Sequence, residues 1–121
     1  MIETLTGFPD NVVAFVGKGR IAKTDYKTVI EPRIDEALKK HDKIRIYYEI
    51  GEDFDGIGPG AMWEDFLVGM GHLTRWERIA LVTDVSWIEN SVKLFRFLMP
   101  HDFKLFRVAE AAEARKWIAA A

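Results

Sequence analysis

The acidic residues that precede a glycine in the middle of the chain are the first candidates for chemistry. Glu52, Asp53 and Asp55 stand directly before Gly56, and closely spaced carboxylates ahead of a glycine are typical of calcium-binding loops. The segment lacks the third oxygen ligand of the Asp-x-Asp-x-Asp-Gly pattern and the bidentate glutamate that completes such loops. We therefore expect solvated carboxylates here and no metal site.

The histidines and the glycine-rich stretch offer little further chemistry. His41, His72 and His101 are not spaced three or four residues apart, so no two of them form a helical metal-binding pair. The stretch 56–60 has no adjacent lysine, serine or threonine that would bind a phosphate, and Pro59 removes one amide donor. The chain has no cysteine, which excludes disulfides, thiolate zinc sites and cysteine nucleophiles.

Acidic residues also follow the predicted strands. Ligands of parallel sheets gather where the strands end, so Asp84, Asp53 and Glu49 can share one edge of the molecule. An enzyme would need Asp53, Asp84 and His72 to converge in one pocket. The simpler interpretation is that Asp84 caps the helix that follows it. We expect no catalytic residue and no cofactor.

Length and composition indicate one globular domain over residues 1–121. Of the 121 residues, 49% are hydrophobic and 30% are charged, and the formal net charge is −2. This balance lacks the basic excess of a nucleic-acid-binding protein, so we expect no nucleic-acid partner. The polar start of the sequence leads us to expect no signal peptide, and no apolar run reaches the ~18–20 residues of a membrane span. These features favour a cytoplasmic location.

Strand and helix patterns alternate along the chain. Runs of β-branched and aromatic residues predict strands over 2–6, 12–16, 43–50, 78–83 and 103–108. Helical spacing of apolar residues predicts helices over 24–40, 61–73, 85–99 and 109–120. Thr24 or Asp25 can cap the first helix, which Pro32 should kink or split. The order β-β-α-β-α-β-α-β-α predicts an α/β fold with parallel pairing, to which the first two strands add an antiparallel pair.

This order of elements, together with two local segments, resembles the STAS / SpoIIAA-like family. The segments read WERIALVTD over 76–84, followed by Trp87, and AAEARKWI over 111–118. They are most similar to the uncharacterised SpoIIAA-like branch rather than to the sporulation regulators. The resemblance covers essentially the whole chain. It implies a mixed sheet of about five strands with about four helices, packed mainly on one side.

The resemblance also implies a regulatory phosphoserine in the anti-anti-sigma members, at the N-terminus of the helix after the third strand. Helix N-termini favour negative charge, which suits a phosphate switch. The matching stretch 55–62 contains no serine or threonine, and neither occurs from Val29 to Leu73. The hydroxyls in that span belong to Tyr47 and Tyr48, in a predicted strand. The phosphoswitch therefore cannot operate here in its usual form.

Two predicted helices carry more apolar surface than one sheet face can bury. Apolar side chains cover roughly 160° of the helices 61–73 and 85–99, against the ~100° stripe of an ordinary surface helix. Methionine and aromatic side chains suit an adaptable binding surface. The candidate ligand-binding residues are Trp63, Phe66, Leu67, Met70, Trp87, Phe95 and Leu98.

Three interpretations of this apolar surplus stay open. The helices can bury it against each other, they can form a groove for an apolar small molecule, a lipid or a membrane surface, or they can form a homodimer interface. The SpoIIAA-like branch is similar in fold to CRAL-TRIO lipid-binding domains, so the resemblance favours the groove.

The glycine-rich loop 51–60 leads into the first of these helices. Its glycines permit large backbone changes, and Pro59 stands at the helix start, so loop and helix can move together as a lid. The residues of this lid are Phe54, Gly56, Gly58 and Gly60. The alternative is a plain surface loop.

These patterns together predict a non-enzymatic cytoplasmic binding or regulatory module. Its apolar site would take a small molecule or lipid, or would hold the protein peripherally at the inner membrane surface. The alternative function is a protein-interaction regulator of the anti-anti-sigma type that works without the serine phosphoswitch.

Overall fold

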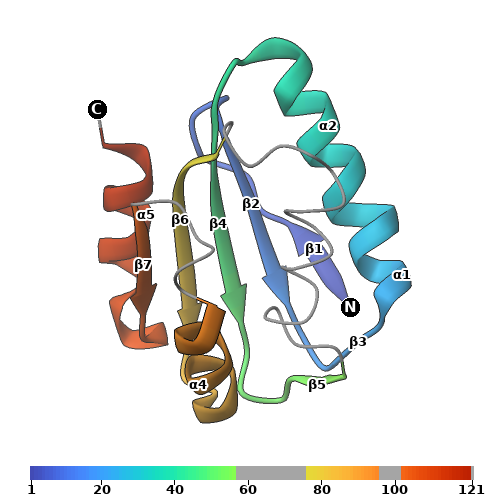
Figure 1. Ribbon diagram of the computed structural model, residues 1–121, viewed down its shortest axis with the longest axis vertical. Helices are drawn as coiled ribbons and strands as arrows, with labels where there is room; N and C mark the ends of the chain where they lie inside the picture. Colours follow the sequence, from blue (N-terminus) through green and yellow to red (C-terminus); the bar gives the residue numbers. More distant parts are fainter. Residues whose placement is uncertain (57–75, 96–101, 121) are drawn as a thin grey trace.

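A mixed five-stranded sheet forms the centre of the molecule (Figure 1). The computed structural model describes residues 1–56, 76–95 and 102–120. The sheet has the order β1-β2-β4-β6-β7. Its strands are β1 (Ile2–Thr4), β2 (Val12–Gly17), β4 (Ile44–Ile50), β6 (Trp76–Thr83) and β7 (Phe103–Phe106). The pair β1–β2 is antiparallel and the others are parallel, which confirms the predicted α/β fold.

Three helical regions flank this sheet in the described part of the chain. The first region is continuous and consists of α1 (Lys23–Asp25), the π-helical turn η1 (Tyr26–Ile30) and α2 (Glu31–Lys40). The second is α4 (Ser86–Phe95). The third is the 3₁₀ turn η4 (Val108–Glu110) followed by α5 (Ala111–Ala119). The helix predicted over 61–73 lies outside the described residues, as does the end of the helix predicted over 85–99.

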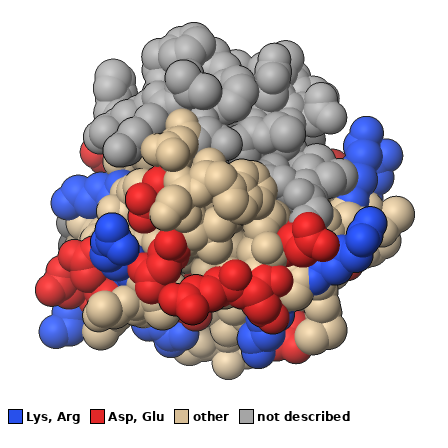
Figure 2. All heavy atoms as spheres, turned by 90° about the horizontal axis from the view of Figure 1, so that it is seen from below, with Lys and Arg blue, Asp and Glu red and all other residues tan. Residues whose placement is uncertain are grey.

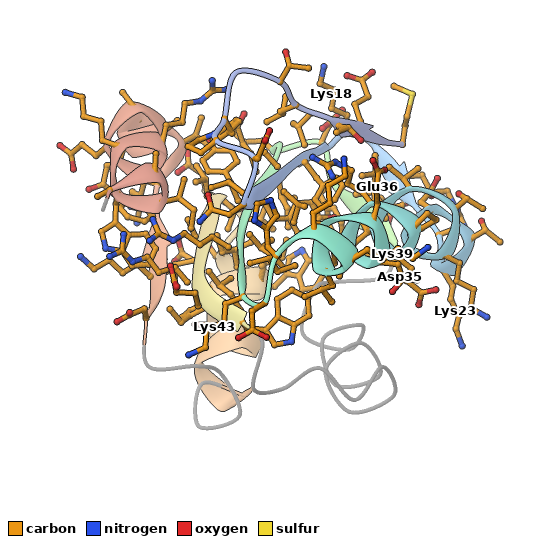
Figure 3. The ribbon with its side chains drawn as sticks, turned by 90° about the horizontal axis from the view of Figure 1, so that it is seen from above. Lys18, Lys23, Asp35, Glu36, Lys39 and Lys43 are labelled. Atoms are coloured by element: carbon orange, nitrogen blue, oxygen red, sulfur yellow. The ribbon has the colours of Figure 1, made fainter. Side chains whose placement is uncertain are left out.

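The alternation of side chains along the strands divides the core into two apolar clusters. One cluster packs against α2 and α4 and includes Val13, Phe15, Ile46, Tyr48, Ile79, Leu81, Ile34 and Ile88. The other packs against α5 and consists of Val12, Ala14, Tyr47, Ala80, Val82, Ala114 and Ile118. Viewed along the strands, α2 and α5 lie on opposite sides of the sheet (Figure 3). The described helices therefore cover both faces, whereas the resemblance implied mainly one.

Pro32 shapes the first helical region without breaking it. Proline has no N–H, and its ring collides with the carbonyl four residues earlier in a regular α-helix. Directly before it the helix widens into η1, where the Glu31 N–H donates to the Tyr26 carbonyl five residues back. The expected kink or split is thus a π-turn in a continuous helical path. This turn buries Tyr26 and Ile30.

The helix also begins earlier than predicted. Lys23 is its first residue, and Ala22 takes the N-cap position that the sequence analysis assigned to Thr24 or Asp25. The Asp25 carboxylate still satisfies a free donor of the first turn, because it accepts a hydrogen bond from the Ala22 N–H at 2.7 Å.

A second, two-stranded sheet lies beside the first and was not predicted. Strands β3 (Arg20–Ile21) and β5 (Asp55–Gly56) pair in parallel, so the predicted loop 51–60 is partly a strand. A Cβ atom at Gly17 would lie 2.6 Å from Ile21 Cδ1 and 3.1 Å from the Tyr48 hydroxyl. The missing side chain at Gly17 therefore lets β3 fold closely over the end of β2.

Gly17→Ala tests this close approach. The added methyl group must push Ile21 and Tyr48 away, so the substitution should lower the free energy of unfolding by about 1–3 kcal/mol. Urea unfolding followed by circular dichroism measures the change. Lys18→Ala is the matched control, because the Lys18–Glu3 ion pair is exposed and should contribute about 0–1 kcal/mol. An unchanged unfolding midpoint in Gly17→Ala would contradict this view of the packing.

Candidate functional site

The parallel strands β2, β4 and β6 end at one level and form a carboxyl edge. The register pairs Gly17 with Ile50, and Ile50 with Thr83. The chain segments that follow these residues meet at the same end of the molecule, together with β3, β5 and the start of α4 (Figure 1). Ligands of α/β proteins bind preferentially at such an edge, so it is the expected place for a site.

Hydrogen bonds fasten the segment 51–56 to this edge. The backbone N–H groups of Gly51, Phe54 and Asp55 donate to the carbonyls of Gly17, Gly51 and Gly19, at 3.1, 3.2 and 3.0 Å respectively. The turn after β4 is thus tied to the connection between β2 and β3. This places Phe54 with its side chain buried.

Only part of the predicted lid can be located. Phe54 and Gly56 belong to the fastened segment, and Gly56 is the last residue of β5. Gly58 and Gly60 lie outside the described residues. Lid motion of the loop stays a prediction.

Trp87 and Phe54 form the apolar centre of the carboxyl edge. Their ring centroids lie 5.4 Å apart, with the ring planes tilted by 42°. Phe54 is 8% exposed, whereas Trp87 is 46% exposed. The next residue along α4, Ile88, is fully buried and holds the first turn of the helix on the core. An exposed indole thus rests on a buried, fixed aromatic base.

The other predicted ligand-binding residues cannot be compared with this pair. Phe95 is the last residue of α4. Outside the described residues lie Trp63, Phe66, Leu67, Met70 and Leu98. The structure therefore joins one predicted ligand-binding residue, Trp87, with one predicted lid residue, Phe54, which the sequence analysis had assigned to separate roles.

The acidic residues expected at this edge do lie there, but they serve different contacts. Asp84 Oδ1 accepts a hydrogen bond from the Val108 N–H at 3.1 Å and lies 4.0 Å from Arg107 Nη1. Asp84 therefore fixes the backbone of η4. The sequence analysis had instead expected Asp84 to cap the helix that follows β6. Glu49 accepts a 2.6 Å hydrogen bond from the Tyr47 hydroxyl, on the side of the sheet that α5 covers.

Exposed carboxylates lie along the carboxyl edge. Seen from this end, acidic side chains form a row across the described surface, with Lys and Arg side chains on both sides of it (Figure 2), and Glu52, Asp53 and Asp55 are exposed. Within residues 1–56, 76–95 and 102–120, no three histidine, aspartate or glutamate side chains are grouped so as to hold a metal ion. His72, which the enzyme hypothesis required, lies outside these ranges.

Buried tyrosines lie under the edge and beneath α5. The Tyr26 and Tyr48 hydroxyls are 3.2 Å apart in the core. Burial raises the pKa of Tyr26 to about 12 and raises the pKa of Tyr48 far above its usual range. Burial and the bond to Glu49 raise the pKa of Tyr47 to about 12. All three hydroxyls stay protonated at neutral pH, so they act as structural hydrogen-bonding groups.

The match to known proteins agrees with this architecture. The sequence model of the SpoIIAA-like family matches residues 12–119. The chain belongs to the SpoIIAA-like family. The crystal structure of an uncharacterised protein from Shewanella loihica PV-4, of the DUF3478 family with a SpoIIAA-like fold, is similar with a TM-score of 0.66 and 24% identity. The similarity covers 98% of this chain and 92% of that one. No curated protein matches the sequence.

These findings fix the family and the fold of this SpoIIAA-like chain and leave its activity to be argued from the site. No helix in the described segments is long and apolar enough to cross a bilayer.

Because these three tyrosines have raised pKa values, we expect the folded chain to lose stability at alkaline pH. Their pKa values in the folded chain exceed the ordinary 10.0, so the unfolded chain releases these protons first. The stabilisation is complete below about pH 10 and is lost as the pH rises towards 12, by ~1.4 kcal/mol per pH unit for each shifted tyrosine. Urea unfolding across this range measures the slope. Tyr26→Phe should make the slope shallower, and an unchanged slope would contradict the assignment.

Proposed function

We propose that this SpoIIAA-like protein is a non-enzymatic binding module that holds an uncharged apolar ligand at its carboxyl edge. The observation that carries the proposal is the 46% exposed indole of Trp87, packed on Phe54 with a centroid distance of 5.4 Å. Aromatic side chains contribute large apolar contact areas, and a tryptophan fixed on a buried ring loses little conformational freedom when a ligand covers it.

The charge of the edge supports an uncharged ligand over an anionic one. Glu52, Asp53 and Asp55 are exposed there, and their field raises the free energy of a nearby carboxylate or phosphate. The same field disfavours contact with an anionic bilayer surface. A neutral apolar molecule therefore fits this edge better than a fatty acid or the inner membrane surface.

The hydrogen bonds that Asp84 and Glu49 already make within the protein support a binding site over a catalytic site. Asp84 is hydrogen-bonded to the backbone of η4, and Glu49 accepts the Tyr47 hydroxyl proton in a hydrogen bond. The hydroxyl in these contacts, that of Tyr47, is not activated as a nucleophile, because burial raises its pKa to about 12. A catalytic site would need such groups to converge on one reacting atom.

Titration with two probes of equal chain length tests the proposal. Dodecanol is uncharged and dodecanoate is anionic at neutral pH, and calorimetry measures binding of each below its aggregation concentration. Dodecanol should bind more tightly, and Trp87→Ser should weaken its binding about tenfold or more. Trp87→Phe keeps an aromatic ring on Phe54 and should retain most of the affinity.

Val108→Ser is the control for this titration. Val108 is also an exposed apolar residue, at 36%, but it lies in η4, so its substitution should leave dodecanol binding unchanged. Equal affinity of Trp87→Ser and the parent would place the site elsewhere. Tighter binding of dodecanoate would overturn the charge argument, and failure of both probes to bind would favour the protein-interaction regulator.

A further inference from the structure

The C-terminal helix α5 is held on the sheet by a small apolar cluster and by ring contacts of Trp117 and Arg115. It has nine residues, of which Ala114 and Ile118 are buried. The sheet face beneath it carries Ala14 and Ala80 together with the larger Val12, Tyr47 and Val82. A helix of this length is not stable alone in water, so it keeps its place only through contacts with the rest of the molecule.

Two arginines supply such contacts at the far end of the helix. Arg45 on β4 and Arg78 on β6 are register partners on adjacent strands. Arg45 Nη1 donates to the carbonyls of Ile118 and Ala120 at 2.9 and 2.5 Å. Arg78 Nη1 donates to the carbonyls of Trp117 and Ala120 at 2.9 and 2.8 Å. Both guanidinium groups therefore meet the last turn of α5.

Electrostatic interactions explain why the two arginines can lie side by side here. Like charges at partnered positions of neighbouring strands repel each other. Here the pair faces carbonyls at the negative end of the helix dipole, of which that of Trp117 also accepts from the Ala120 N–H at 3.3 Å. Glu77 Oε1 lies 2.5 Å from Arg45 Nε and offsets one positive charge. The arginine pair is thus favourable only while the end of α5 stays in place.

The opposite end of α5 is fastened independently. The Val108 N–H donates to Asp84 Oδ1 at 3.1 Å, and the Arg107 N–H donates to Glu110 Oε1 at 2.9 Å. These bonds hold η4, the short 3₁₀ turn from which α5 starts. Such a turn can absorb a change of direction while its own anchor stays intact.

We infer that α5 is a hinged cover that opens as a unit, separately from the sheet. The Arg45–Arg78 pair is its latch and η4 is its hinge. Opening uncovers the second apolar cluster of the sheet, including Tyr47 and Val82, together with the two arginines. Opening of the cover uses none of the Trp87–Phe54 contacts on which the proposed ligand site depends.

Hydrogen exchange of the intact chain, followed by mass spectrometry at neutral pH, tests this inference. In the parent protein, amides of α5 should exchange faster than amides of β4 and β6, because they open without global unfolding. Arg78→Met removes two charge-assisted hydrogen bonds of a half-buried side chain, and buried Arg45 keeps Glu77 as its ion-pair partner. It should speed exchange in α5 about tenfold or more and leave β4 unchanged.

Two further variants separate a latch from a general loss of stability. Arg33→Met replaces a half-buried arginine on α2, on the other face of the sheet, and should not change exchange in α5. Ile46→Val destabilises the first cluster and should speed exchange in β4, so the ratio of α5 to β4 rates should fall. Equal rates for α5 and β4 in the parent, or an equal acceleration of both by Arg78→Met, would overturn the inference.

Discussion

Burial of β4 on both faces is the constraint on which the rest of the structure depends. Ile46 and Tyr48 point into the cluster under α2, and Tyr47 points into the cluster under α5. A central parallel strand must bury both faces and pair on both edges, so β2, β6 and the helices take their positions from it. The one charge that β4 buries, Arg45 at 9% exposure, is tolerated because carbonyls and Glu77 surround it.

The proposed ligand site and the base of α5 are linked through the end of β6. Asp84 follows β6 directly and hydrogen-bonds to the backbone of η4, at the base of α5. Three residues further on, Trp87 rests on Phe54 at the carboxyl edge. The hinge of the cover and the proposed ligand site therefore share one short segment. A displacement of α4 or of η4 would therefore act on this same segment.

The strands that carry a strong pattern could be predicted from the sequence. The apolar runs of β2, β4 and β6 identify them, and their alternation with helices predicts the parallel sheet. The β3–β5 pair could not be predicted, because two-residue strands carry no periodicity and their pairing depends on the missing side chain at Gly17. Likewise, Pro32 signalled an irregular helix, but only the structure shows that the irregularity is a π-turn.

Both residues of the candidate site were named from the sequence, but the contact between them could not be predicted. Trp87 and Phe54 were both named from the sequence, yet nothing local links two rings so far apart along the chain. The roles of Arg45 and Arg78 were missed because each reads as an ordinary strand residue. The available signal was that both lie on the same face of neighbouring strands, where two like charges require a shared negative partner.

Native mass spectrometry of the protein purified without detergent, with analysis of its organic extract, tests the central claim most directly. The account predicts a chain carrying an added mass that enters the extract as an uncharged apolar compound. The same preparation of Trp87→Ser should give the bare chain. An adduct that persists unchanged in Trp87→Ser, an anionic lipid in the extract, or a bare parent chain would contradict an apolar site on Trp87.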